Sequence, residues 1–248
     1  ANNALTLEGY WLTYLRNTDS SNEVRLLLCN LTAGGCSGPD ISVADYGYFY
    51  LRTFPSVASF PAATPGGMAF GAAVVWPNTE GGGGTNYGDI MGRCYDSNGN
   101  PSGAAFVVGD GSATEQFSNP DVSMFPDGSF VVSWMNADYV LYRIYSVSGT
   151  GQCQPLGGMQ EQEACDTGGA FACSLDFSKV AQYGAHGRVA LAANISNPSR
   201  QFRIGYTTLD ASDDKQFATR LIQWNGTTSS ILNHTGLPTI AVHGTNVY

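Results

Sequence analysis

Residues 119–134 read NPDVSMFPDGSFVVSW, and this stretch decides the fold. An apolar segment is followed by a Pro-Asp-Gly turn signal and by a second apolar segment that ends in tryptophan. β-Branched and aromatic residues on both sides of a glycine turn are typical of a β-hairpin. We therefore predict a strand, a tight turn and a second strand.

The same pattern returns in three other places. Residues 54–76 repeat it around an insertion, residues 179–191 repeat it in a shorter form, and residues 237–248 begin it without completing it. A β-rich period of about 60 residues predicts a propeller or another array of β units. The aligned positions, 65, 58 and 60 residues apart, are Val57, Val122, Val180 and Ile240.

The two ends of the chain complement each other. The last copy stops after its first strand, whereas residues 9–14 match the second strand of the pattern. Because an open array would leave two raw sheet edges, we expect the ends to share one sheet. The predicted fold class is all-β, a β-propeller of about four four-stranded blades with one blade shared between the N- and C-terminal strands.

The repeat predicts one domain, residues 1–248, although a string of small β domains is an alternative. Half-buried third strands are predicted at 23–28, 89–95, 139–145 and 201–206, and glycine hairpin turns at 96–101 and 146–151. The approximate repeats are 1–53 with 237–248, 54–118, 119–172 and 173–236.

Composition excludes several classes of partner. Only 12% of the 248 residues are charged and the formal net charge is −9, so no basic face is expected for nucleic acid or for an anionic membrane. The longest apolar run, Met68–Trp76, is too short to cross a bilayer. We predict no nucleic-acid partner and no membrane insertion.

Six dispersed cysteines, without a Cys-x-x-Cys spacing, predict three disulfides formed in an oxidising compartment. Cys29 with Cys36 and Cys153 with Cys165 would each close a local loop, which leaves Cys94 with Cys173. Other pairings remain open, because spacing does not fix connectivity.

Four N-x-S/T sequons are predicted N-glycosylation sites at strand ends or turns. Together with the cysteines they predict a secreted or cell-surface glycoprotein, and the start at Ala1 is compatible with a processed chain. The predicted acceptors are Asn30, Asn194, Asn225 and Asn233.

Residues 89–101, 106–108 and 119–134 resemble the tandem repeats of very large bacterial surface and adhesin-like proteins. That unit reads Asp-Ile-x-x-Arg-x-Tyr-Asp followed by a Pro-x-Val, Asp-Gly, Phe-Val-Val-x-Trp hairpin. The resemblance is close over residues 54–150. It implies an extracellular, propeller-like, non-enzymatic unit without catalytic residues.

The chain has no Gly-x-Ser-x-Gly elbow, His-Glu-x-x-His helix or phosphate-binding glycine loop. Asp96-x-Asn98-x-Asn100 begins like a calcium loop, but Pro101 stands where an EF-hand needs glycine, so a hairpin turn is predicted. The acidic run 210–214 is interpreted as a solvated loop rather than a weak calcium site. We predict no cofactor and no metal.

A propeller glycosidase would need a pair of carboxylates facing each other near the centre. Asp121 is the acid beside a predicted inner strand, whereas its counterparts Ser56 and Thr239 are neutral. A glycan-active hydrolase is therefore the third functional hypothesis.

The first hypothesis is a non-catalytic, structural or adhesive module, not an enzyme, that self-assembles into an extracellular array or filament. Its predicted partners are copies of itself, joined by strand exchange or head-to-tail contact. The alternative is a lectin-like propeller with glycans as partners. Its sugar-stacking residues would be Tyr46, Tyr48, Tyr50 and Tyr87.

Overall fold

The computed structural model describes residues 9–17, 22–30, 36, 38–45, 55–59, 71–78, 88–111, 117–125, 127–135, 140–148, 151–165, 188–190, 200–209, 215–225 and 229–236. Within these ranges the chain is all-β, apart from one short 3-10 turn, η1 (Leu156–Gly158). The predicted all-β class is confirmed.

The described strands form four antiparallel sheets that follow one another along the chain. The first sheet has the order β1 (Gly9–Asn17), β2 (Asn22–Asn30), β3 (Asp40–Asp45). The second has the order β4 (Ser56–Ser59), β5 (Ala72–Asn78), β6 (Asp89–Tyr95), β7 (Phe106–Gly109).

The third sheet has the order β8 (Ser118–Met124), β9 (Phe130–Met135), β10 (Val140–Val147), β11 (Cys153–Pro155). A further strand, β12 (Gln162–Cys165), pairs with another part of β10. The fourth sheet has the order β13 (Arg188–Ala190), β14 (Arg200–Leu209), β15 (Lys215–Trp224), β16 (Ser229–Gly236).

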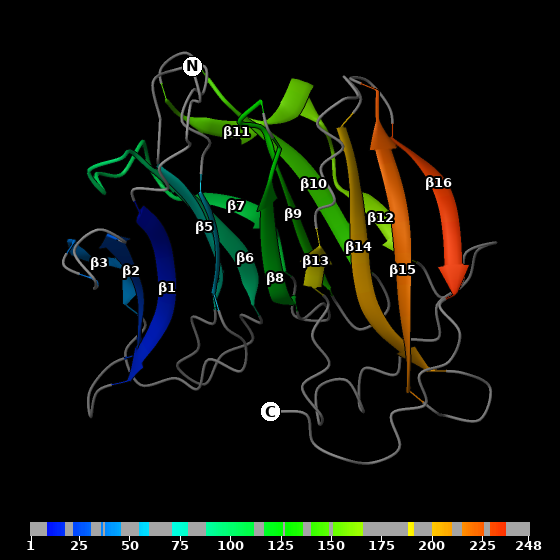
Figure 1. The fold of residues 1–248 in the computed structure, drawn as a ribbon, viewed down its shortest axis with the longest axis horizontal. Helices are drawn as coiled ribbons and strands as arrows, with labels where there is room; N and C mark the ends of the chain where they lie inside the picture. The colour runs from blue at the N-terminus through cyan, green and yellow to red at the C-terminus, as the bar shows by residue number, and fades with distance from the viewer. Residues whose placement is uncertain are drawn as a thin grey trace, which may run out of the picture.

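The sheets stand beside one another in chain order. In Figure 1 the first sheet lies at the left, the second and third in the middle and the fourth at the right. The first strand of each sheet contacts the first strand of the next: β1 contacts β4, β4 contacts β8 and β8 contacts β13. Of these, β4, β8 and β13 are called the inner strands below.

The apolar runs of the repeat form strands that are buried on both faces. All six residues of β9 are buried, and in β5 only the last residue is partly exposed. Side chains alternate between the two faces of a strand, so a strand that is apolar at every position needs a cover on each side. The second and third sheets have such covers, because each stands between two neighbours.

Three hydrophobic clusters fill the spaces between successive sheets. Trp76 packs toward the first sheet, and its neighbour Val75 packs toward the third. Trp134 in turn packs toward the second sheet, whereas Val131 packs toward the fourth. Each buried valine or larger side chain contributes roughly 1.5–3 kcal/mol, so these interlayers hold the sheets together.

The turns have the chemistry that the sequence predicts. Gly128 has a φ of 82°, which an L-residue rarely adopts, and Phe125 N–H donates to Ser129 O across the turn at 2.7 Å. Asp96–Asn100 and Ser148–Gln152 close in the same way, with N–H to O distances of 2.9 and 2.8 Å. The predicted hairpin turns are confirmed.

The cysteine pairing differs in part from the suggested one. Cys29 bonds to Cys36, as suggested, but Cys94 bonds to Cys153. The suggested bonds of Cys153 with Cys165 and of Cys94 with Cys173 are therefore corrected; Cys173 itself lies outside the described residues. Cys94 ends its strand in the second sheet and Cys153 begins one in the third, so sheet packing brings together two cysteines 59 residues apart.

Other differences concern strands. No strand was predicted at 162–165, yet β12 forms there and pairs with β10. β16 was not expected as a strand, although it pairs with β15 over most of its length. The expected strands at 179–181 and 237–240 lie outside the described residues, so the shared sheet and the domain boundaries stay predictions.

Replacing Cys94 and Cys153 together by serine should lower the free energy of unfolding by about 4 kcal/mol, because a loop of 59 residues is no longer closed in the unfolded chain. The matched control is the double replacement of Cys29 and Cys36, whose loop of 7 residues predicts a loss of roughly 2 kcal/mol. Urea titration of both variants measures the difference. Equal losses would contradict the inter-sheet role of the longer bond.

Tyr145 is a buried titratable group whose pKa is strongly shifted. Its ring stacks on Phe130 at 5.3 Å between centroids, and its side chain is 0% exposed. Burial raises the pKa of Tyr145 to about 12; the charge of Arg143 opposes the rise, and that of Glu161 adds to it. A phenolate is thus disfavoured in the folded protein.

The free energy of unfolding should therefore fall between pH 10 and 12. Unfolded tyrosine loses its proton near pH 10, whereas Tyr145 keeps it to about 12 in the folded chain, so up to roughly 3 kcal/mol of stability is lost across this window. Y145F should remove this contribution and flatten the alkaline limb in urea titrations. Phe is also expected to be tolerated at pH 7, because its ring keeps the buried stacking on Phe130.

Candidate functional site

A carboxylate and a hydroxyl meet where the second and third sheets touch. Ser56 Oγ on β4 donates to Asp121 Oδ1 on β8 at 2.5 Å. The backbone N–H of Val122 lies 3.0 Å from the same carboxylate oxygen and 3.3 Å from Ser56 Oγ. Two inner strands are thus linked by one polar contact.

The position follows from the repeat. Ser56 and Asp121 occupy the same place in successive repeats, one residue before the aligned valines, so neighbouring sheets bring equivalent positions together. The ladder between β8 and β9 is irregular between Ser118 and Asp121, and Asn119 has a positive φ of 50°. Asp121 stands opposite Ser133, which is 2% exposed.

This carboxylate is half-buried and fixed in place by its donors. A positioned carboxylate in partly dry surroundings is the group that general-base, nucleophilic or charge-stabilising catalysis needs. Sequence reasoning named Asp121 but judged Ser56 only as a neutral counterpart, and the structure makes Ser56 its hydrogen-bond donor.

A second polar cluster crosses the outward face of the first sheet. Arg25 donates to Asp40 Oδ1 from Nε at 3.0 Å and to Glu23 Oε2 from NH1 at 2.8 Å, and Tyr14 OH donates to Asp40 at 3.0 Å. The hydrogen bond from Arg25 holds the pKa of Asp40 below its usual value, and that bond in turn raises the pKa of Arg25. Because the Asp40 side chain is 40% exposed, such pairs stabilise the fold by under about 1 kcal/mol.

Asp96, the first residue of the calcium-loop-like stretch, forms hydrogen bonds within the hairpin turn. Asp96 Oδ1 accepts hydrogen bonds from the backbone N–H groups of Asn98 and Asn100 at 2.9 and 2.8 Å. Burial raises the pKa of Asp96, but the hydrogen bonds from Asn100, Asn98 and Gly99 outweigh it and the pKa lies below its usual value. The carboxylate oxygens therefore stabilise the turn, as the hairpin interpretation predicts.

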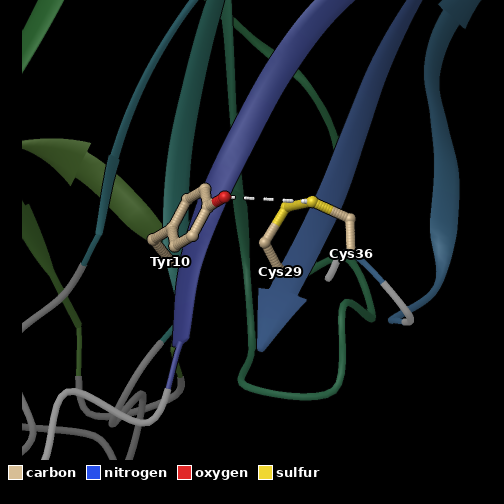
Figure 2. Close-up of a disulfide and its surroundings, with 3 residues drawn as sticks. All are labelled: Tyr10, Cys29 and Cys36. Carbon is tan, nitrogen blue, oxygen red and sulfur yellow. Dashed lines mark hydrogen bonds between the residues drawn. A yellow bond between two sulfur atoms is a disulfide. The ribbon is translucent and has the colours of Figure 1, made fainter. Parts of the chain in front are cut away.

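The Cys29–Cys36 bond lies at the end of the first sheet. Figure 2 shows the Tyr10 hydroxyl directed at Cys36, with an O to Sγ distance of 4.0 Å. Cys29 is 1% exposed, whereas Cys36 is exposed. The bond joins the end of β2 to the chain that leads into β3.

The predicted glycosylation sites have different settings. Asn30 ends β2, Asn225 is exposed directly after β15, and Asn233 lies inside β16 opposite Leu221 rather than in a turn. Asn194 lies outside the described residues. The four tyrosines proposed for sugar stacking and the acidic run 210–214 also lie outside them.

Sequence reasoning missed the buried polar groups between the sheets. Arg93 NH1 on β6 donates to Val43 O on β3 of the first sheet at 3.3 Å, and Tyr95 is fully buried beside it. Arg143 and Tyr145 repeat this spacing on β10. The repeated Arg-x-Tyr was the available signal.

No group of three or more metal-ligating side chains occurs among the residues whose placement the structure describes. In the same part of the chain no helix is long and apolar enough to cross a membrane. Two disulfides, Cys29–Cys36 and Cys94–Cys153, join cysteines within the described ranges, which fits folding in an oxidising compartment.

Comparison with known proteins gives one similarity of fold. No protein-family model matches the chain, and no curated protein matches it. A solved structure described as the crystal structure of a thermostable family-43 glycoside hydrolase is similar with a TM-score of 0.48 and 12% identity, covering 96% of this chain and 76% of that one.

This finding corrects two predictions. The chain was expected to be a non-catalytic structural or adhesive module and not an enzyme, whereas the similar solved structure is that of a hydrolase. At this identity and TM-score no residue role transfers from that enzyme. The chemistry of this chain has to be argued from its own contacts.

Proposed function

We propose that the chain is a glycan-active hydrolase in which Asp121 is a catalytic carboxylate. The observation that carries the proposal is the contact of Asp121 with Ser56 between two inner strands, 2.5 Å long and half-buried. It places an oriented carboxylate where neighbouring sheets approach each other. Glycosides are also the substrates that the name of the similar hydrolase gives.

A single carboxyl group can fill one of two roles in glycoside hydrolysis, that of the acid or that of the base or nucleophile. Hydrolysis of a glycosidic bond uses two carboxyl groups, one as acid and one as base or nucleophile. Asp121 Oδ1 accepts hydrogen bonds from Ser56 and from the Val122 N–H, and both donors favour the ionised form. Asp121 is therefore assigned the base or nucleophile.

D121N should lower kcat for glycan hydrolysis at least about 100-fold, because a positioned base contributes roughly that much or more. The assay is release of reducing ends from a panel of polysaccharides and aryl glycosides, with Tm measured for each variant. D110N is the matched control, since Asp110 is an exposed aspartate beyond β7. Wild-type turnover in D121N, or no hydrolysis of any glycan by the wild type, would overturn the assignment.

We further propose that the four sheets are blades of a propeller and that residues 237–240 supply the inner strand of the first one. Support comes from the sheet orders: β5 and β9 each have a preceding strand, β4 and β8, on their inner edge. β1 matches β5 and β9 in sequence pattern but forms the edge of its sheet among the described residues. The repeat predicts the missing strand at 237–240.

Deletion of residues 237–248 should lower Tm and expose the β1 edge, because its backbone N–H and C=O groups lose their partners. A synthetic peptide of the same twelve residues should restore Tm at saturating concentration, and a scrambled peptide should not. Light scattering shows whether the intact chain closes on itself or on a second copy. A deletion without effect on Tm would contradict the shared sheet.

The disulfides, the sequons and the proposed C-terminal strand also suggest a compartment and a partner. Two disulfides favour an extracellular protein, and the four sequons are proposed as N-glycosylation sites of a secreted chain. Copies of the chain that exchange the C-terminal strand are the proposed protein partner. The likeness to bacterial surface repeats supports the extracellular location only.

A further inference from the structure

We propose that Arg93 and Tyr95 bind a small monovalent anion, of the halide type, between the first and second sheets. The two residues are two positions apart on β6, so they share one face of the sheet. Tyr95 is 0% exposed and belongs to the cluster that fills this space. Arg93 reaches across it, with NH1 3.3 Å from Val43 O on β3.

Two polar atoms in this space lack a partner beyond each other's side chain. Arg93 Nε and Tyr95 OH are both buried, and outside the interaction of Arg93 with the Tyr95 hydroxyl neither atom has a hydrogen-bond partner among the described residues. A buried polar atom without a partner costs roughly 1–3 kcal/mol, and such atoms are rare in folded proteins. Arginine only donates and a tyrosine hydroxyl can donate, so the group that completes this site is an acceptor.

Charge favours an anion over a water molecule as that acceptor. Arg93 forms no ion pair with a carboxylate of the described residues, unlike Arg25, which pairs with Glu23 and Asp40. Burial raises the pKa of Tyr95, whereas the positive charge of Arg93 and a side-chain hydrogen bond from Arg93 oppose the rise, which places the cation close to the hydroxyl. A buried or half-buried cation without a carboxylate is stabilised by a bound counter-ion.

The molecule contains its own control. Arg143 and Tyr145 repeat the spacing on β10, and Arg143 Nε and Tyr145 OH are likewise buried with no hydrogen-bond partner outside this pair among the described residues. This second space lies between the second and third sheets. Here the negative charge of Glu161 acts on Tyr145. The negative charge of Glu161 therefore disfavours an anion beside Arg143 and Tyr145.

The experiment compares thermal unfolding of the intact chain in sodium chloride, bromide and gluconate at constant ionic strength. Chloride and bromide should raise Tm saturably by a few degrees over gluconate, because they bind the folded state. Y145F should keep this rise and Y95F should lose it. R93K is a second variant, expected to weaken the rise because lysine has no Nε–H fork.

Crystals soaked in sodium bromide provide the direct measurement. An anomalous peak is expected within hydrogen-bonding distance of Arg93 Nε and Tyr95 OH, with none beside Tyr145. A halide-independent Tm in the wild type, a halide effect that survives in Y95F, or a water without anomalous signal at Arg93 would each overturn the proposal.

Discussion

The structure depends on strands that are buried on both faces. β5 and β9 have almost no exposed residue, so neither can lie at a surface. A sheet with two apolar faces is stable only between two other layers, and the three hydrophobic clusters are those interlayers. The row of sheets in Figure 1 is the consequence.

The first sheet shows the opposite pattern, because one of its faces has no described neighbour. Trp11 is buried at 6% exposure, whereas Tyr10 and Leu12 on the other face are each 43% exposed. The ladder of Glu23, Arg25 and Asp40 covers the rest of that face with charge. Charged groups beside the exposed Tyr10 and Leu12 limit the size of the apolar patch on this face.

Polar contacts between described residues cross from one sheet to the next. One is the hydrogen bond from Ser56 to Asp121, and another is that from Arg93 to Val43 O. In a low-dielectric interlayer such groups need partners, and groups that are held there are candidates for chemistry or for ligand binding. The expectation of a non-catalytic chain gave little weight to Asp121, because in the linear sequence its counterpart Ser56 is neutral; in space, Ser56 orients it.

The sequence by itself determined the all-β class, the repeat and the turns, because glycine at positive φ and apolar residues at successive strand positions act locally. It also predicted the bond between Cys29 and Cys36, which are seven residues apart. Only the tertiary structure decided the Cys94–Cys153 bond, the added strands β12 and β16 and the meeting of Asp121 with Ser56. These contacts join residues of different sheets or depend on an available sheet edge, and the spacing of residues along a chain does not encode how layers stack.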